Sequence, residues 1–290
     1  MLKQICALCI KATLDMNFGK KMAQTLQNPA LSQTYPLEDI LDDRLEIEKL
    51  KSLGLTTRCK MIRKILSART TNPIPSAIAA SALTKIFNSF EISEEFYDWQ
   101  REKRHLFVTA LMDKNNRLIL ESYRNWNKIS PTIQKQAIKK ATRIHRDIYV
   151  DGVCQPLPYS VNFEERAIRR TGLNLSIVFG RFNGNIETGE GTITQYMEHG
   201  HLLHNAREAF DTTHHETTHL IQHHLSVAFQ RGGIKSSHPL RREAACFHEI
   251  DRHHVYVSSK ETVTYLSQPH EVLAHQEGHK ISLAIEALAL

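Results

Sequence analysis

The residues best suited to chemistry are two histidines and a glutamate in the run His215-Glu216-Thr217-Thr218-His219. Histidines four residues apart in a helix lie on one face, about 40° apart around the axis and one turn apart along it. That separation lets two imidazole nitrogens bind one Zn²⁺ ion at about 2.0–2.1 Å. Glu216 lies beside them, where its carboxylate can act on a water held by the metal instead of binding the metal. The spacing predicts a zinc site with His215 and His219 as ligands.

The abundance of histidine offers an alternative explanation of this spacing. Fifteen of the 17 histidines lie between His199 and His279, so surface histidines on an amphipathic helix could produce the same pattern. The helical context favours the metal site, because Phe210, Leu220 and Val227 supply an apolar back to the segment.

A catalytic zinc usually has three protein ligands and one open position. Three downstream residues are candidates for the third ligand: His238, Glu243 and Glu271. His238 precedes a proline in an expected loop, and Glu243 follows two arginines. Glu271 follows Pro269, which favours the first turn of a helix, where a carboxylate is also stabilised by the helix dipole alone. The residue types leave the choice open.

The elements around this run alternate between short strands and helices. Strands are expected over Leu157–Phe163, Leu173–Phe182 and Gly191–Tyr196. The histidines should lie on a helix over about Asp211–Gln230, which ends at two glycines, and a last helix should begin near Pro269.

An amphipathic helix is expected to precede the strands. Ser130 and Pro131 form an N-cap and first-turn pair. Behind them an apolar stripe recurs at helical spacing and should face the core: Ile133, Ala137, Ala141, Ile144 and Ile148. Helical patterns also dominate the chain before this point, so the sequence predicts an α+β fold with a helical N-terminal region.

Composition and charge narrow the class of protein. The chain has 290 residues with 41% hydrophobic and 23% charged residues, which is typical of globular domains. No run approaches the roughly 18 apolar residues of a membrane span, and no standard secretory signal is expected. Residues 1–150 carry a net charge of +10 (25 Lys/Arg, 15 Asp/Glu), and residues 151–290 carry −4 (12 and 16). This asymmetry suggests different roles for the two halves.

The sequence resembles the zincin metallopeptidases, in particular the gluzincin branch whose third ligand is a glutamate. Many small zincins continue from H-E-x-x-H to a segment Y-x-x-x-P-x-E-x-x-A. Here Tyr265, Pro269, Glu271 and Ala274 match each defined position. The resemblance covers about residues 126–290, and it implies that Gly191–Tyr196 is the edge strand along the cleft. It implies that Glu271 is the third ligand, with Glu243 as the alternative.

The resemblance also implies a division of the chain and a donor for the reaction. The resemblance does not reach residues 1–125, which would form a helical N-terminal region used for substrate recognition, targeting or cover. Residues 126–290 would form a zincin-like catalytic domain with a small mixed sheet packed on the H-E-x-x-H helix. Tyr265 would donate to the oxyanion of the reaction, with His254 and Tyr256 as other candidates.

The expected function is that of a zinc-dependent endopeptidase. It would hydrolyse a protein or peptide substrate with zinc-activated water, Glu216 being the general base. Such a chain would fit a bacterial effector or toxin, made in the cytoplasm and exported without a standard signal peptide. The alternative is a zincin-fold binding or regulatory protein without peptidase activity, although Glu216 between the histidines favours an enzyme. No nucleic acid is expected as a partner, because no recognised motif accompanies the basic N-terminal half.

Overall fold

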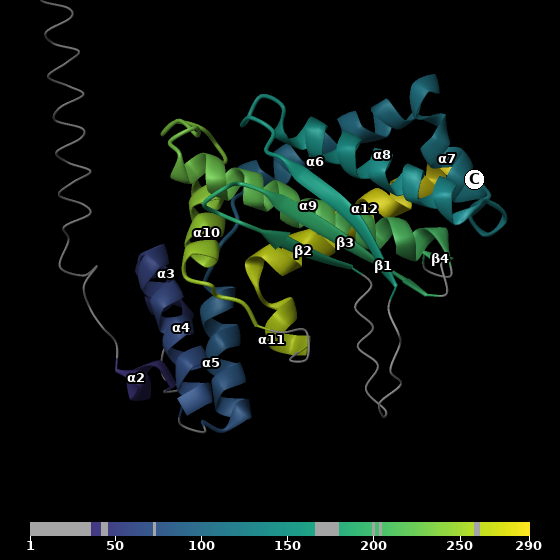
Figure 1. Ribbon diagram of the computed structural model, residues 1–290. Helices are drawn as coiled ribbons and strands as arrows, with labels where there is room; N and C mark the ends of the chain where they lie inside the picture. The colour runs from purple at the N-terminus through teal and green to yellow at the C-terminus, as the bar shows by residue number, and fades with distance from the viewer. Residues whose placement is uncertain are drawn as a thin grey trace, which may run out of the picture.

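The computed structural model describes residues 36–41, 46–71, 74–165, 180–198, 201–202, 205–257 and 262–290. They form an α+β fold in which one small mixed sheet packs against α9 of a largely helical body (Figure 1). The helices are α2 Leu37–Leu41, α3 Ile47–Ser52, α4 Leu55–Thr71, α5 Ser76–Asn88, α6 Glu94–Leu111, α7 Arg117–Arg124, α8 Pro131–Val150, α9 Ala206–Gln230, α10 Arg241–Arg252, α11 Thr262–Leu266 and α12 Pro269–Ala289. The strands are β1 Tyr159–Glu165, β2 Gly180–Gly184, β3 Gly191–Glu198 and β4 His201–Leu202. No helix in these ranges has both the length and the apolar character to cross a membrane.

The sheet is built around β3. Strand β1 pairs with it in parallel, with Tyr159 opposite Gly191, and β2 pairs with its other edge in antiparallel, with Gly180 opposite Gln195. Strand β4 pairs with the end of β3. The prediction that Gly191–Tyr196 is an edge strand is therefore wrong. Within the described residues, β2 has no strand on its outer side.

Helix α8 begins at the predicted residue and has the predicted cap, since the Ser130 side chain accepts a hydrogen bond from the Ile133 nitrogen. Its buried face, however, lies about one residue further along than the predicted stripe. Ala137 and Ala141 are buried, whereas Ile133 is 38% exposed. The residues buried in place of the isoleucines at 133, 144 and 148 are Gln134, Ile138, Thr142, His145 and Tyr149. The stripe was misplaced because polar side chains occupy the core face here: His145 Nδ1 lies 3.1 Å from His214 Nδ1 on α9.

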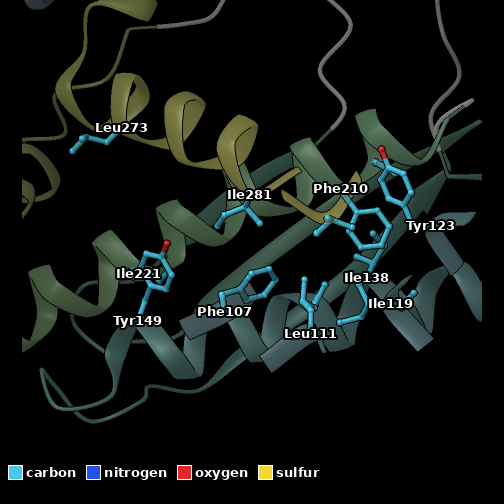
Figure 2. Packing of buried hydrophobic residues seen from close by; sticks show 14 of the residues in the cluster. Phe107, Leu111, Ile119, Tyr123, Ile138, Tyr149, Phe210, Ile221, Leu273 and Ile281 are labelled. Carbon is cyan, nitrogen blue, oxygen red and sulfur yellow. The ribbon is translucent and has the colours of Figure 1, made fainter. Parts of the chain in front are cut away.

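Two hydrophobic clusters organise the helices. In the first, α6, α7 and α8 pack with α9 and α12 (Figure 2). In the second, α2–α5 pack with Cys246 and Ile250 of α10 and with Val255 and Val257 after it. Residues 94–125 thus contribute to the same core as α9 and α12, so the division predicted at residue 125 does not coincide with the division between clusters. Residues 1–35 of the predicted N-terminal region lie outside the described residues.

Helix α12 approaches the backbone of α9 closely at Gly278. A methyl group placed on Gly278 would lie 2.8 Å from the His215 backbone nitrogen and 2.9 Å from the Asp211 carbonyl oxygen. Only a glycine therefore lets the two helix backbones meet here. The crossing lies within one turn of the histidines that the sequence singles out.

Replacing Gly278 by alanine should destabilise the protein, although alanine is normally favoured over glycine in a helix by about 1 kcal/mol. The added methyl group must push the two helices apart, and overpacking of this kind costs about 1–3 kcal/mol. Urea unfolding would measure the change. Gln276→Ala, an exposed position on the same helix, should change stability by no more than about 0.5 kcal/mol and serves as the control. A Gly278→Ala protein as stable as the wild type would contradict the close crossing.

Candidate metal centre

Helix α9 positions the two histidines. Asn205 caps its first turn by accepting a hydrogen bond from the Glu208 nitrogen, and the helix then runs unbroken past both residues. His215 and His219 lie one turn apart on one face, and their Nε2 atoms are 3.2 Å apart. Their side chains are 13% and 11% exposed, so both imidazoles sit in a largely dry environment. The helix and the pairing of the imidazoles follow the prediction.

Helix α12 brings Glu271 to this pair. Its Oε2 atom lies 3.5 Å from His215 Nε2 and 3.3 Å from His219 Nε2. With the 3.2 Å between the two nitrogens, the three donor atoms form a nearly equilateral triangle. Ligands of a tetrahedral ion with bonds of about 2.0–2.2 Å lie about 3.3–3.5 Å from one another. The described residues therefore hold a donor set of the size that a small tetrahedral cation needs.

The two other candidates for the third ligand lie elsewhere. Glu243 is fully buried at the start of α10, where its Oε1 accepts a hydrogen bond of 3.0 Å from the Ser93 nitrogen at the start of α6. His238 lies in the loop before α10, where its Nδ1 accepts from the Leu240 nitrogen. Both side chains stabilise local structure. The structure brings Glu271 to the histidines and not Glu243 or His238.

Glu216 points from α9 toward the sheet. One of its carboxylate oxygens lies within 4.8 Å of a nitrogen of His215 and of a nitrogen of His219. Glu216 is only 5% exposed and lies under the first residue of β2, so that a methyl group on Gly180 would be 3.2 Å from its Oε1. A carboxylate at this separation can share a water molecule with a cation held by the imidazoles.

Residues that the sequence did not single out orient these donors. Gln222 Oε1 accepts from His219 Nδ1 at 2.9 Å, and Gln222 Nε2 donates to the His270 carbonyl oxygen at 2.9 Å. Gln222 therefore fixes the ring of His219 and ties α9 to the first turn of α12. Metal-binding histidines usually have such a partner on the other nitrogen. Its position three residues after His219 was the one available signal, since helix residues three apart share a face.

Tyr265 lies on the other side of Glu271. Its hydroxyl is hydrogen-bonded to the Glu271 carboxylate, and burial together with that carboxylate holds the pKa of Tyr265 well above its ordinary value. Tyr256, which is 56% exposed, packs edge-on against Tyr265 with ring centroids 6.2 Å apart. The candidate Tyr265 thus contacts the third donor. His254, another candidate, lies two residues after the end of α10 and has a positive φ of 49°.

Gln268 holds this tyrosine segment in place. It is the residue before Pro269, the first residue of α12. Its side-chain amide accepts from the Val257 nitrogen and donates to the carbonyl oxygens of Val257 and Tyr265. One buried amide therefore links the segment after α10, the end of α11 and the start of α12.

The electrostatics of the centre follow from burial and from close pairs. Burial lowers the pKa of His215 to about 4, so this imidazole is neutral near pH 7. Burial would also lower the pKa of His219, but the Glu271 carboxylate raises it to about 9. The two imidazoles in turn hold the pKa of Glu271 well below its usual range in spite of burial. The site therefore carries an ionised carboxylate and the uncharged His215, the forms that bind a cation, whereas His219 must release its proton when a cation binds.

Burial has the opposite effect on Glu216. Removal from water raises the pKa of its carboxyl to about 7, an effect that His219 opposes and Glu271 reinforces. A carboxyl group with this pKa gains and loses a proton near neutral pH, which is the property of an effective general base.

No protein-family model matches the chain, and neither the curated proteins nor the solved structures include a significant match to it.

Replacing Glu271 by alanine should lower the affinity for Zn²⁺, used as the probe cation, by at least about tenfold. Substitution of residues that merely support metal ligands already causes losses of that size. Glu243→Ala should leave the affinity unchanged. That variant should instead lose about 1–3 kcal/mol of unfolding free energy, since the Ser93 nitrogen loses its acceptor. Calorimetric Zn²⁺ titration and urea unfolding of both variants would measure the two effects. The reverse pattern would move the third ligand to Glu243.

Proposed function

We propose that this protein is a zinc-dependent endopeptidase. The observation that carries the proposal is the triangle of His215 Nε2, His219 Nε2 and Glu271 Oε2, with edges of 3.2–3.5 Å. A buried carboxylate, Glu216, lies beside the triangle and is not one of its corners. Three donors with an adjacent general base are the arrangement of a hydrolytic zinc centre, whereas a structural site needs no base.

The donor set supports zinc as the cation. Two imidazoles and one carboxylate are typical ligands of catalytic zinc, and three protein ligands leave one position open. Zn²⁺ in such a site lowers the pKa of a water molecule toward 7 and polarises a substrate carbonyl. The remaining groups of the chain must bind the substrate, move protons and stabilise the developing charge.

Glu216 is the group that moves the proton. It takes a proton from the attacking water and then gives it to the leaving amine, so that the carboxylate is regenerated at the end of each cycle. Its burial under Gly180 keeps bulk water from the carboxylate and brings its pKa near neutrality. Positioned general-base catalysis of this kind contributes about 10²–10⁴-fold to the rate.

Tyr265 is the proposed donor to the oxyanion. Because its pKa lies well above the ordinary value, its hydroxyl keeps its proton. The hydroxyl holds Glu271 and can turn to a substrate oxygen that enters beside this residue. The exposed Tyr256 next to it is available for contacts with the substrate chain.

Strand β2 is suited to hold an extended substrate. Its inner edge pairs with β3, and within the described residues its outer edge pairs with no strand. Gly180, the first residue of β2, lies next to Glu216, so a peptide added to this edge would pass the general base. In Figure 1, β2 is the strand of the sheet drawn nearest to α11 and the start of α12.

Glu216→Gln is expected to reduce cleavage of a protein substrate such as casein by at least about a hundredfold, because the amide cannot accept the proton. Zinc content and melting temperature should stay close to those of the wild type, since Glu216 is not one of the three donors. Glu208→Gln, the same exchange at an exposed position of α9, is the matched control and should leave cleavage unchanged.

Three results would contradict the proposal. Equal cleavage by wild type and Glu216→Gln would assign the activity to another base or another protein. Loss of zinc in Glu216→Gln would make Glu216 a ligand. A zinc-loaded wild type that cleaves no substrate in a proteome-wide assay would favour the alternative of a binding protein.

A further inference from the structure

His275 lies one turn after Glu271 on α12, so both side chains leave the same face of the helix. Its ring centroid is 4.3 Å from that of His215, with the two planes at 54°. One nitrogen of His275, one nitrogen of His215 and one carboxylate oxygen of Glu271 lie within 4.8 Å of one another. His275 therefore shares two residues with the donor triangle described above.

The backbone under His275 is fixed by the helix crossing. Gly278, three residues later, is pressed against the backbone of α9 at His215. The His275 side chain itself is exposed. It would complete a tetrahedral site if a rotation brought its nitrogen to roughly 3.3–3.5 Å from the other donors.

A second interpretation is that His275 only orients His215. The Nδ1 atom of His215 is buried and has no hydrogen-bond partner among the described residues, so it lacks the support that Gln222 gives to His219. A residue with that role alone would need to reach His215 but not Glu271. Its nitrogen reaches both, and this favours a role as a metal ligand.

We propose that His275 is a fourth, displaceable protein ligand of the cation held by His215, His219 and Glu271. The inference rests on the zinc site of the proposed function and adds a resting state to it. Sites with four protein ligands are closed, whereas sites with three keep a position for water or substrate. Binding of His275 thus closes the centre, and a substrate must displace the imidazole before it can react.

Two effects of opposite sign follow for His275→Ala. The affinity for Zn²⁺ should fall by about tenfold or more, because a ligand is lost. The affinity of the zinc-loaded protein for acetohydroxamate, a small chelating probe, should rise. If His275 occupies the fourth position about nine times in ten, its removal raises the apparent affinity of the probe about tenfold.

The experiment compares wild type, His275→Ala and His279→Ala. His279 is exposed one turn further along the same helix and belongs to neither donor group, so it is the matched control. Zn²⁺ and acetohydroxamate affinities come from calorimetry, and X-ray absorption of the zinc-loaded proteins counts the bound imidazoles. We expect three imidazoles in wild type and in His279→Ala but two in His275→Ala. Since the side chain of His275 is exposed, the melting temperature of the zinc-free protein should be unchanged.

The outcomes separate this inference from the zinc site itself. Two imidazoles in both wild type and His275→Ala, with equal affinity for the probe, would overturn the inference and leave the three-ligand site intact. A weaker Zn²⁺ affinity without a change in imidazole count or probe affinity would reduce His275 to a residue that positions His215. Failure of wild type to bind Zn²⁺ through His215, His219 and Glu271 would instead refute the proposed function.

Discussion

The contact of α12 with α9 at Gly278 is the constraint on which the candidate centre depends. The two helix backbones meet there without a side chain between them, next to His215. With the axes fixed at this point, the first turn of α12 must lie over the histidine pair. That is why Glu271, which is 52 residues after His219 in the chain, comes within 3.3 Å of it. Gln222 adds a second link one turn further along α9, through the His270 carbonyl oxygen. The geometry of the donors is thus a consequence of helix packing and not of a local loop.

The same packing buries three further histidines of α9, at positions 214, 223 and 224. The helix is covered by the sheet, α8, α10 and α12, so few of its positions reach water. Burial lowers the pKa of His214 and His224 to about 3 and that of His223 to about 4, and these imidazoles are neutral components of the core. In contrast, the Glu271 carboxylate raises the pKa of His219 above its ordinary value. A buried ion pair is costly to assemble unless its charges compensate each other, which is a reason to expect a functional role for this pair.

Local patterns in the sequence predicted the parts of the site that lie on single helices. The i, i+4 histidines, the Ser130 cap and the start of α12 at Pro269 depend on residues within one or two turns, and the structure shows each of them. The residue types left the choice between Glu271 and Glu243 open, because both are first-turn carboxylates. The resemblance favoured Glu271, and the helix crossing is what brings it to the histidines. The prediction of an edge strand over Gly191–Tyr196 failed for a similar reason. The place of β3 in the sheet depends on its pairing with β1 and β2, which local sequence patterns do not reveal. The buried face of α8 was misplaced because His145 and Tyr149 point inward, which a count of apolar residues cannot detect.

The N-terminal helices α2–α5 are connected to the site through the second hydrophobic cluster, which includes the two valines that flank Tyr256. In the segment after α10 the side chains alternate between the two sides. Val255 and Val257 are buried in the cluster of α2–α5. Tyr256 between them is exposed, and its ring packs against Tyr265 and His270. Gln268 bonds both backbone groups of Val257, so the position of this segment is shared with the start of α12. Packing of α4 and α5 against α10 and α11 therefore supports the side of the centre that Tyr256 and Tyr265 form. Substitutions in this cluster should affect the tyrosines first, because the histidines are held by the separate cluster around α9 and α12.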